Sequence, residues 1–291
     1  MQLVVAATSK VAIPTIQKLK EHHNLKIITQ PDRPAGRGKS LTPSEISSAY
    51  PESLKPESES QISEILKGSD LLITIAYGRL LSKEVLDIPK FGGINLHFSL
   101  LPRWRGAAPV QRALEAGDRI TGVTVFQMDQ GMDSGPIWCQ RTVEIPYGSN
   151  ATELFKDLAD IGASAVQDSI TQIISGGSPK EQAGEITFAP KISKSECAIN
   201  WSVDAEAIMR KIRAFSESPG VFTSIRGTII KINDAQISRN SLLPGELSQD
   251  GCVGTGKESI QLLEVTPAGK RRMSARDWLN GFKPIAGERF E

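Results

Sequence analysis

Three polar side chains near the middle of the chain have the types and the spacing of an acyl-transfer site. Asn95 and His97 occupy alternate positions of the apolar run "INLHF", and Asp133 lies between Gly131 and Gly135 in "GMDSGPI". Because alternate side chains of a strand share one face, we expect Asn95 and His97 to lie together. An Asn amide and a His ring can stabilise a developing oxyanion, and an Asp can orient the ring and raise its pKa. These residues therefore predict acyl transfer accompanied by proton transfer.

Each of the three also has an ordinary structural explanation, which the sequence leaves open. His97 is otherwise a buried histidine satisfied by backbone groups, and Asn95 is otherwise a polar residue at the end of a strand. Asp133, between glycines, is otherwise a turn residue. No serine or cysteine is visibly paired with His97, which favours direct transfer to an external nucleophile over a covalent intermediate.

The elements that must position these residues alternate between strands and helices. Apolar runs predict strands near residues 2–7, 25–29, 71–76, 93–98 and 121–128. Helical spacing predicts helices near residues 11–22, 59–68, 82–88, 107–117 and 150–175. This alternation predicts an α/β fold with a mostly parallel, doubly wound sheet. Ligands of such sheets bind beyond the carboxyl ends of the strands, which is where Asn95 and His97 fall.

The rest of the chain has a different pattern. We expect a first domain over residues 1–186, an extended linker over residues 187–203 and a second domain over residues 204–291. A helix near residues 204–215 precedes short β-like runs near residues 221–225, 228–232, 251–256 and 259–265. Short strands separated by glycine and proline suggest a small β-barrel or sandwich.

Composition and local patterns argue against several classes of protein. The first strand-to-helix turn, "AATSKVA", contains no glycine, which argues against a dinucleotide-binding turn. The apolar runs are strand-sized, and the first residues lack the pattern of a secretory signal, so we expect no membrane segment. Cys139, Cys197 and Cys252 have no metal-ligand spacing, so we expect no metal and a reduced, cytoplasmic location. The net charge of +1 requires a local patch for any nucleic-acid partner.

Two cationic segments are candidates for such a patch. The first is "QPDRPAGRGKS", residues 30–40, whose cations are Arg33, Arg37 and Lys39. Its glycines and prolines predict a mobile loop without helix or strand, at the same end of the sheet as the polar residues. The second is the run Lys270, Arg271 and Arg272. The alternative for the first segment is an ordinary solvated surface loop.

Several motifs together resemble the methionyl-tRNA formyltransferase family. These motifs are "INLHFSLLPRWRGAAPVQ", "GMDSGPI", "QPDRPAGRGK" and "PAGKRRMSARDWLNG", and the likeness runs in order through nearly the whole chain. The Asn-x-His-x-Ser-Leu-Leu-Pro run and the later Asp are shared by the broader group of 10-formyltetrahydrofolate-dependent transferases. The other motifs point to the narrower family. The resemblance implies a Rossmann-like catalytic domain followed by an OB-like β-barrel domain that helps to hold tRNA.

The resemblance also implies roles for individual residues. Asn95, His97 and Asp133 occupy the catalytic positions, and Arg37 occupies the position of a loop arginine that recognises the acceptor end of initiator tRNA. The loop that shapes the folate site comprises Ser99, Leu100, Leu101 and Pro102. Further candidates for an RNA-facing rim are Arg103, Arg105 and Arg112, and the alternative for each is a solvated or ion-paired side chain. The implied reaction moves a formyl group from 10-formyltetrahydrofolate to the α-amine of methionyl initiator tRNA and releases tetrahydrofolate. We expect a monomer and no metal.

Two departures from the family pattern and two rival functions remain. The first turn lacks the family's usual glycine, and Phe98 replaces a commonly small residue, so we expect altered packing rather than lost activity. One rival is a formyltransferase acting on glycinamide ribonucleotide or a nucleotide-linked amino sugar. The other is a non-catalytic RNA-binding protein with a transferase fold. The loop around Arg37 and the second domain argue against the first rival, and the intact Asn, His and Asp set argues against the second.

Overall fold

The computed structural model describes residues 1–35, 40–216 and 219–291, and the described chain forms two compact units. Unit 1 comprises Met1–Pro109, Ile120–Glu144 and Phe155–Ala189. Unit 2 comprises Val110–Arg119, Ile145–Leu154 and Pro190–Glu291. Each unit is described by itself below.

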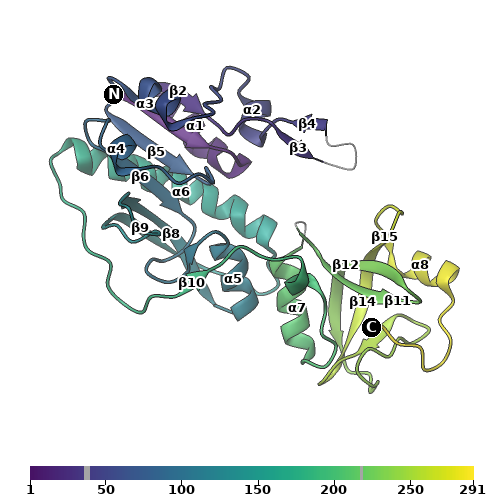
Figure 1. Cartoon of the computed structure of the whole chain (residues 1–291). Helices are drawn as coiled ribbons and strands as arrows, with labels where there is room; N and C mark the ends of the chain where they lie inside the picture. Colours follow the sequence, from purple (N-terminus) through teal and green to yellow (C-terminus); the bar gives the residue numbers. More distant parts are fainter. Residues whose placement is uncertain (36–39, 217–218) are drawn as a thin grey trace. The chain divides into compact units, whose positions relative to one another are not determined.

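Unit 1 is built on a six-stranded sheet with the order β2-β1-β5-β6-β8-β9 (Figure 1). Its strands, in chain order, are β1 (Gln2–Ala7), β2 (Asn24–Ile28), β5 (Leu71–Ile75), β6 (Gly93–His97), β8 (Ile120–Gln127) and β9 (Ile137–Glu144). The first four are parallel, whereas β8 is antiparallel to both β6 and β9. The predicted α/β fold is confirmed, but the sheet ends in two antiparallel strands. The sequence pattern missed β9 because this edge strand exposes many of its side chains.

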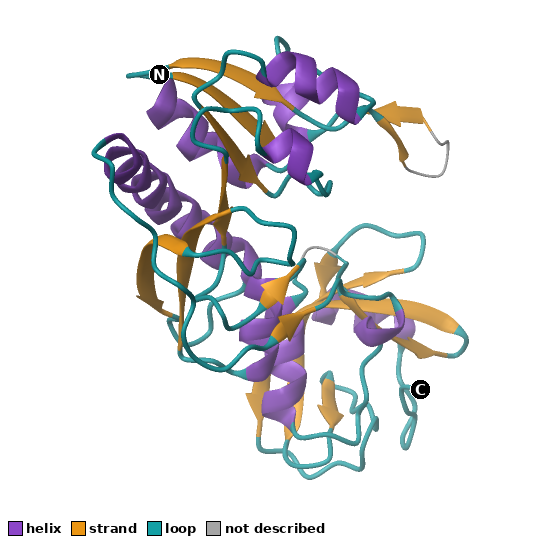
Figure 2. Ribbon diagram, turned by 60° about the vertical axis from the view of Figure 1, so that its left-hand side comes forward, coloured by secondary structure: helices purple, strands orange, loops and turns teal. Residues whose placement is uncertain are grey.

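Helices pack on both faces of the sheet (Figure 2). On one face, Val4 and Leu72 of the strands share a core with Ile62 of α3 (Glu59–Leu66) and Val85 of α4 (Lys83–Leu86). The other face meets α6 (Ala151–Ile174), where an added Cβ on its Gly162 would lie 2.7 Å from the Leu96 side chain. Asn95 and His97 alternate with Leu96, so they lie on the face opposite α6. Further helices are η1 (Lys10–Ala12), α1 (Ile13–Lys20), α2 (Glu45–Ala49) and α5 (Pro109–Ala116).

The segment expected to be a loop without strands forms part of a hairpin instead. β3 (Arg33–Ala35) pairs antiparallel with β4 (Ser40–Thr42), so this expectation was wrong. A two-stranded ribbon leaves one edge of each strand free, which accommodates Pro34 although proline has no N–H to donate. Arg37 and Lys39 lie outside the described residues.

Unit 2 contains a curled antiparallel sheet with the order β11-β12-β14-β13. Its strands are β11 (Val221–Ile225), β12 (Thr228–Ser238), β13 (Cys252–Gly254) and β14 (Ser259–Pro267), with β15 (Met273–Ser274) paired to β14. This half-barrel confirms the predicted OB-like domain. A short turn, η2 (Ser195–Cys197), precedes α7 (Ala205–Ala214), which packs on β12.

The last helix, α8 (Ala275–Phe282), was not predicted, although its start has a recognisable signal. The hydroxyl of Ser274 accepts a hydrogen bond from the backbone N–H of Asp277, which caps the helix at its first residues. Trp278 of this helix stacks on Phe282 and on Phe290 near the chain end. Phe290, near the chain end, is therefore part of the core of unit 2.

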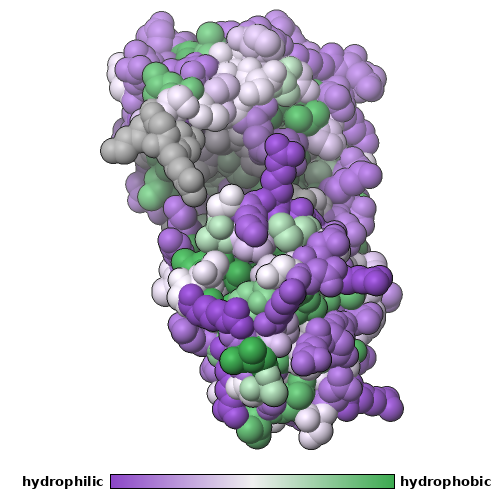
Figure 3. Space-filling view, turned by 90° about the vertical axis from the view of Figure 1, so that its right-hand side faces the viewer, coloured by the Kyte–Doolittle hydropathy of each residue, from purple (hydrophilic) through white to green (hydrophobic). Residues whose placement is uncertain are grey.

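One face of the molecule is largely polar. Hydrophilic residues predominate on the face drawn in Figure 3, and hydrophobic residues are scattered among them. Within the described part of the chain, no helix has both the length and the apolar character needed to cross a membrane.

Candidate active site

His97, the last residue of β6, is held between two oxygen atoms from different segments. Its Nε2 lies 2.9 Å from the backbone oxygen of Trp104, and its Nδ1 lies 3.6 Å from Oδ2 of Asp133. The same Asp133 oxygen accepts a hydrogen bond of 2.7 Å from the backbone N–H of Gly106. The structure thus brings together two of the three residues that the sequence singled out, although at 3.6 Å the His97–Asp133 contact is an ion-pair distance and not a hydrogen bond.

Burial lowers the pKa of the His97 imidazole, while the negative charge of Asp133 and the contact with the Trp104 carbonyl act in the opposite direction. Asp133 by itself raises the pKa of His97, as expected from the sequence. The effect of burial is larger, so the net change in this pKa is downward. The ring is therefore neutral near pH 7. Because a carbonyl oxygen can only accept, Nε2 carries the proton of the neutral ring, and the lone pair of Nδ1 faces Asp133. A proton that arrives at Nδ1 would be stabilised by the carboxylate.

Asn95 completes this group from the same strand. It is half-buried and lies two residues before His97, which places the two residues on one face about 7 Å apart. Across the ladder Asn95 pairs with Phe126 of β8, and His97 pairs with Thr124. The Asn95 side chain makes no hydrogen bond to any other described residue, so its amide is available to a substrate.

The loop predicted to shape the folate site is held by its own backbone and by β8. Ser99 donates a hydrogen bond of 2.6 Å from its hydroxyl to the backbone oxygen of Arg103. Thr124 donates to the backbone oxygen of Ser99 at 2.6 Å and accepts from the N–H of Leu101 at 3.2 Å. The Leu101–Pro102 peptide bond is cis. Ser99, Leu101 and Pro102 are buried, and Leu100 is half-buried.

Thr124 was not recognised from the sequence as part of the site. It is fully buried, and its hydroxyl also accepts a hydrogen bond from the side chain of Gln140. The sequence did contain a signal for Thr124, which is a polar residue between Val123 and Val125 in a buried strand. Buried hydroxyls need hydrogen-bond partners, so such a residue indicates a specific contact.

Two backbone positions on the other side of His97 also went unrecognised. Trp104 has a φ of +64°, and its N–H donates to the hydroxyl of Thr187 at 2.9 Å. Gly106 belongs to β7 (Arg105–Gly106), which pairs with β10 (Phe188–Ala189). A Cβ at position 106 would lie 2.7 Å from the backbone oxygen of Ala189, and the φ of Gly106 is +124°. Only glycine fits there, so this close approach requires the glycine that the sequence has at position 106.

Comparison with known proteins places this geometry in a family. The Formyl transferase model matches residues 1–170, and the Formyl transferase, C-terminal domain model matches residues 191–283. The methionyl-tRNA formyltransferase of Methylococcus capsulatus is 38% identical over 99% of each chain. That of Aromatoleum aromaticum is 40% identical over 91% of this chain and 88% of its own. The chain belongs to the methionyl-tRNA formyltransferase family.

A solved structure shows the same fold at lower sequence identity. HypX from Aquifex aeolicus, determined in complex with tetrahydrofolic acid, superimposes with a TM-score of 0.72 at 17% identity. The match covers 99% of this chain and 48% of HypX. Family membership argues against both rival functions considered from the sequence, since the relatives above are named for methionyl-tRNA.

The cations predicted to contact RNA differ in their ion pairs and in the exposure of their side chains. Arg112 is not free, because its guanidinium pairs with Glu115 at 2.8 Å and Glu196 at 2.7 Å, and only 11% of its side chain is exposed. This pairing matches the alternative of an ion-paired side chain. Arg272 pairs with Glu264, whereas Lys270 and Arg271 are exposed and make no ion pair with described residues. Arg33 is exposed and donates to the side chain of Gln30 at 3.1 Å.

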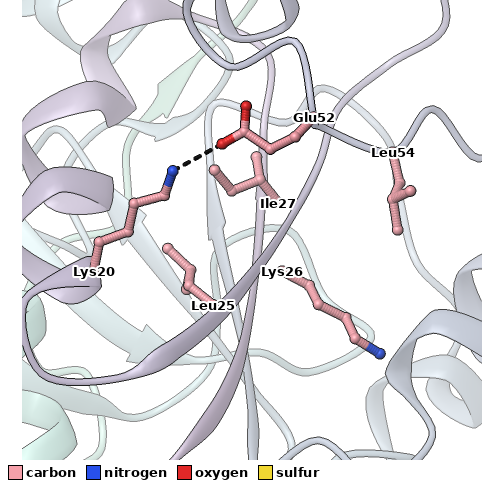
Figure 4. Close-up of a pocket in the computed structure, with 6 residues that line it drawn as sticks. All are labelled: Lys20, Leu25, Lys26, Ile27, Glu52 and Leu54. Atoms are coloured by element: carbon pink, nitrogen blue, oxygen red, sulfur yellow. Dashed lines mark hydrogen bonds and ion pairs between the residues drawn. The ribbon is translucent and has the colours of Figure 1, made fainter.

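Two hollows lie on unit 1, and neither contains the His97 group. One, of about 240 Å³, lies beside β2, where Lys20 and Glu52 point toward each other and pair at 2.9 Å (Figure 4). Its other lining residues are Leu25, Lys26, Ile27 and Leu54. The second, of about 500 Å³, adjoins Leu101 of the loop after β6 and Gln140 of β9. Within the described residues, no group of three or more His, Cys, Asp or Glu is arranged to hold a metal ion.

Proposed function

We propose that Asn95, His97 and Asp133 transfer a formyl group from 10-formyltetrahydrofolate to the α-amine of methionine esterified to initiator tRNA. The observation that carries the proposal is the position of His97 between the Asp133 carboxylate and the Trp104 carbonyl, beside an amide with no partner among described residues. The names of the relatives at 38% and 40% identity support the choice of acceptor.

The proposed chemistry begins with attack of the neutral amine on the formyl carbon. Esterification lowers the basicity of the amine, so a useful fraction is neutral near pH 7. As the new C–N bond forms, negative charge develops on the formyl oxygen, to which the side-chain N–H of Asn95 donates a hydrogen bond. Removing one such donor from an acyl-transfer site raises the barrier by about 3–4 kcal/mol.

His97 moves the proton that the amine must lose. Burial keeps the ring neutral, so Nδ1 is able to accept that proton, and the resulting imidazolium lies between the Asp133 carboxylate and the Trp104 carbonyl. The same proton passes to N10 as the bond between the formyl carbon and N10 breaks. Tetrahydrofolate and the formylated amine are the products, and the protein returns to its starting state.

We further propose that the loop of Ser99, Leu100, Leu101 and Pro102 forms a wall of the folate site. Support comes from the hydrogen bonds that Thr124 of β8 makes to the backbone of Ser99 and Leu101. These bonds fix the backbone of the loop that follows His97. A fixed wall orients the formyl group without a cost in loop ordering when the donor binds.

We assign catalysis to the domain of residues 1–186 and tRNA binding to residues 204–291, with residues 187–203 as the linker. Lys270 and Arg271 are exposed cations suited to phosphate, and Arg272 contributes less because it is paired with Glu264. Arg33 is an exposed cation on the β3–β4 hairpin. The roles of Arg37 and Lys39 stay predictions, as do the monomeric state and the cytoplasmic location.

Transfer of labelled formyl tests the proposed function directly. The purified chain should formylate methionyl initiator tRNA at a far higher kcat/KM than methionyl elongator tRNA, with 10-formyltetrahydrofolate as the donor. A nucleotide-linked amino sugar and glycinamide ribonucleotide serve as alternative acceptors. Formylation of either one without formylation of methionyl-tRNA would contradict the proposal.

A further inference from the structure

Gln182 lies in the segment after α6, and its side chain reaches the turn that carries Asp133. Its amide nitrogen donates hydrogen bonds to the backbone oxygens of Asp133, at 2.8 Å, and Gly135, at 2.9 Å. Its amide oxygen accepts hydrogen bonds from Nη2 and Nε of Arg105, at 2.7 and 3.2 Å. A side-chain amide has two N–H donors and two acceptor lone pairs, so every hydrogen-bonding position of Gln182 is filled.

These contacts join the two backbone segments that hold His97. Arg105 directly follows Trp104, whose carbonyl oxygen lies 2.9 Å from Nε2 of His97. Asp133 lies 3.6 Å from Nδ1 of the same ring. Contacts therefore link His97 to Asp133, Asp133 to Gln182 and Gln182 to Arg105. The chain itself links Arg105 to Trp104, whose carbonyl contacts His97 again.

Both segments have backbone conformations that residues other than glycine rarely adopt. The φ of Trp104 is +64° and that of Asp133 is +50°. Such conformations cost free energy and persist only where the surrounding contacts enforce them. Gln182 binds the carbonyl of Asp133 itself, so its amide acts on one of these two residues directly.

We propose that Gln182 is a positioning residue for formyl transfer, which sets the Asp133 carboxylate against His97 by binding the carbonyls of the Asp133 turn. This inference rests on the function proposed above. An amide suits the position because a single planar group must donate to two carbonyls and accept from a guanidinium. A glutamate would keep the contact with Arg105 but has no proton to donate to the carbonyls of Asp133 and Gly135.

The test compares Gln182→Ala and Gln182→Glu with the unaltered full-length chain, and Gln172→Ala is the matched control. Gln172 is exposed on α6, and its side chain makes no hydrogen bond with described residues. We expect kcat to fall by about 10- to 100-fold in both Gln182 variants, because small displacements of catalytic groups are costly. KM for methionyl-tRNA and for 10-formyltetrahydrofolate should stay within about twofold of the unaltered value, since neither variant removes a group assigned to substrate binding. Gln172→Ala should keep full activity.

The pH profile of kcat distinguishes positioning from general support of the fold. Asp133 raises the pKa of His97, so a displaced carboxylate lets that pKa fall further. Because His97 must be neutral to accept a proton, the acidic limb should move to lower pH in both Gln182 variants. Thermal unfolding of the same samples shows whether each variant is folded.

Several outcomes would overturn the inference. Full kcat in Gln182→Glu together with a loss in Gln182→Ala would mean that only the Arg105 contact matters. An unmoved acidic limb in both variants, or an activity loss that matches the loss of folded protein, would also refute a positioning role. If the unaltered chain transfers no formyl group, the proposed function fails and this inference falls with it. If it does, fully active Gln182 variants refute the role of Gln182 alone.

Discussion

Nε2 of His97 lies 2.9 Å from the backbone oxygen of Trp104, seven residues further along the chain. Because the carbonyl can only accept a hydrogen bond, this contact fixes the proton of the neutral ring on Nε2 and leaves Nδ1 as the basic nitrogen. The loop after β6 therefore selects the tautomer of the histidine at the end of that strand. The predictions that follow depend on this arrangement.

Removing the imidazole should abolish most turnover while substrate binding persists. We expect His97→Ala to lower kcat by at least about 100-fold, because proton acceptance at Nδ1 is lost. The dissociation constant for 10-formyltetrahydrofolate, measured by calorimetry, should change little. His22→Ala is the control, since that ring is exposed and lies outside the site. Near-normal turnover of His97→Ala would remove His97 from the mechanism.

Replacing Asn95 should affect turnover through the oxyanion. Asn95→Ala removes the N–H donor and should lower kcat by about 100- to 1,000-fold. Asn95→Asp should be no better, because a carboxylate repels the developing negative charge. Asn24→Ala, at the exposed start of β2, should behave like the unaltered chain. Single-turnover rates with saturating substrates measure the effect, and an unchanged rate in Asn95→Ala would contradict the assignment.

Asp133→Asn should change both the rate and its dependence on pH. The Asn side chain keeps an oxygen for the N–H of Gly106 but removes the charge that raises the pKa of His97. The pKa of His97 therefore falls, and the acidic limb of the kcat profile moves to lower pH. The plateau should also fall, because the imidazolium loses its counter-charge. A profile of unaltered shape and height would leave Asp133 as a turn residue only.

Glu196 should stabilise unit 2 in a pH-dependent way. Hydrogen bonds from the backbone and hydroxyl of Ser193, and then from Arg112, lower the pKa of Glu196 to about 2. Stability from this carboxylate is present above the pKa of about 4.3 in the unfolded chain and is lost as the pH falls toward the folded value. Because the side chain is 39% exposed, solvent limits the contribution to about 1 kcal/mol or less.

Glu196→Gln tests this directly. Its Tm should lie a few degrees below that of the unaltered chain near pH 7, and the gap should close as the pH falls from about 4.5 toward 2. Glu206→Gln is a useful comparison, since its carboxylate also pairs with an arginine, Arg213 at 2.9 Å. A gap in Tm that is constant over this range of pH would rule out the charge of Glu196 as its cause.

Neutralising the cations that precede β15 should weaken tRNA binding and reduce its salt dependence. We expect replacement of Lys270 and Arg271 by glutamine to lower the slope of log K against log salt by about 1–2. Arg272→Gln alone should have less effect, because Arg272 is paired with Glu264. Filter binding of initiator tRNA at several salt concentrations gives the slope. An unchanged slope in the double variant would place the tRNA contact elsewhere.

The repeating local patterns of this chain could be read from its sequence. The strand positions, the shared face of Asn95 and His97 and the turn at Asp133 depend on side-chain periodicity and on glycine spacing, which are local properties. The family motifs extended this local information to the catalytic roles that we propose. Edge strand β9 and hairpin β3–β4 were missed because exposed edge strands show little alternation and tolerate proline.

Only the tertiary structure determines which groups surround the residues of the candidate site. Trp104 and Gly106 contact the site through backbone groups, and Gln182 does so through its side-chain amide. The segments involved are up to 85 positions apart in the sequence, as between His97 and Gln182, and no local pattern encodes such contacts. Burial of His97 depends on the packed sheet around it, so the net direction of its pKa could not be foreseen from the adjacent charge alone. The sequence left open whether Arg112 is ion-paired. The structure pairs it with Glu196, because ion pairs form between side chains that only the folded chain places side by side.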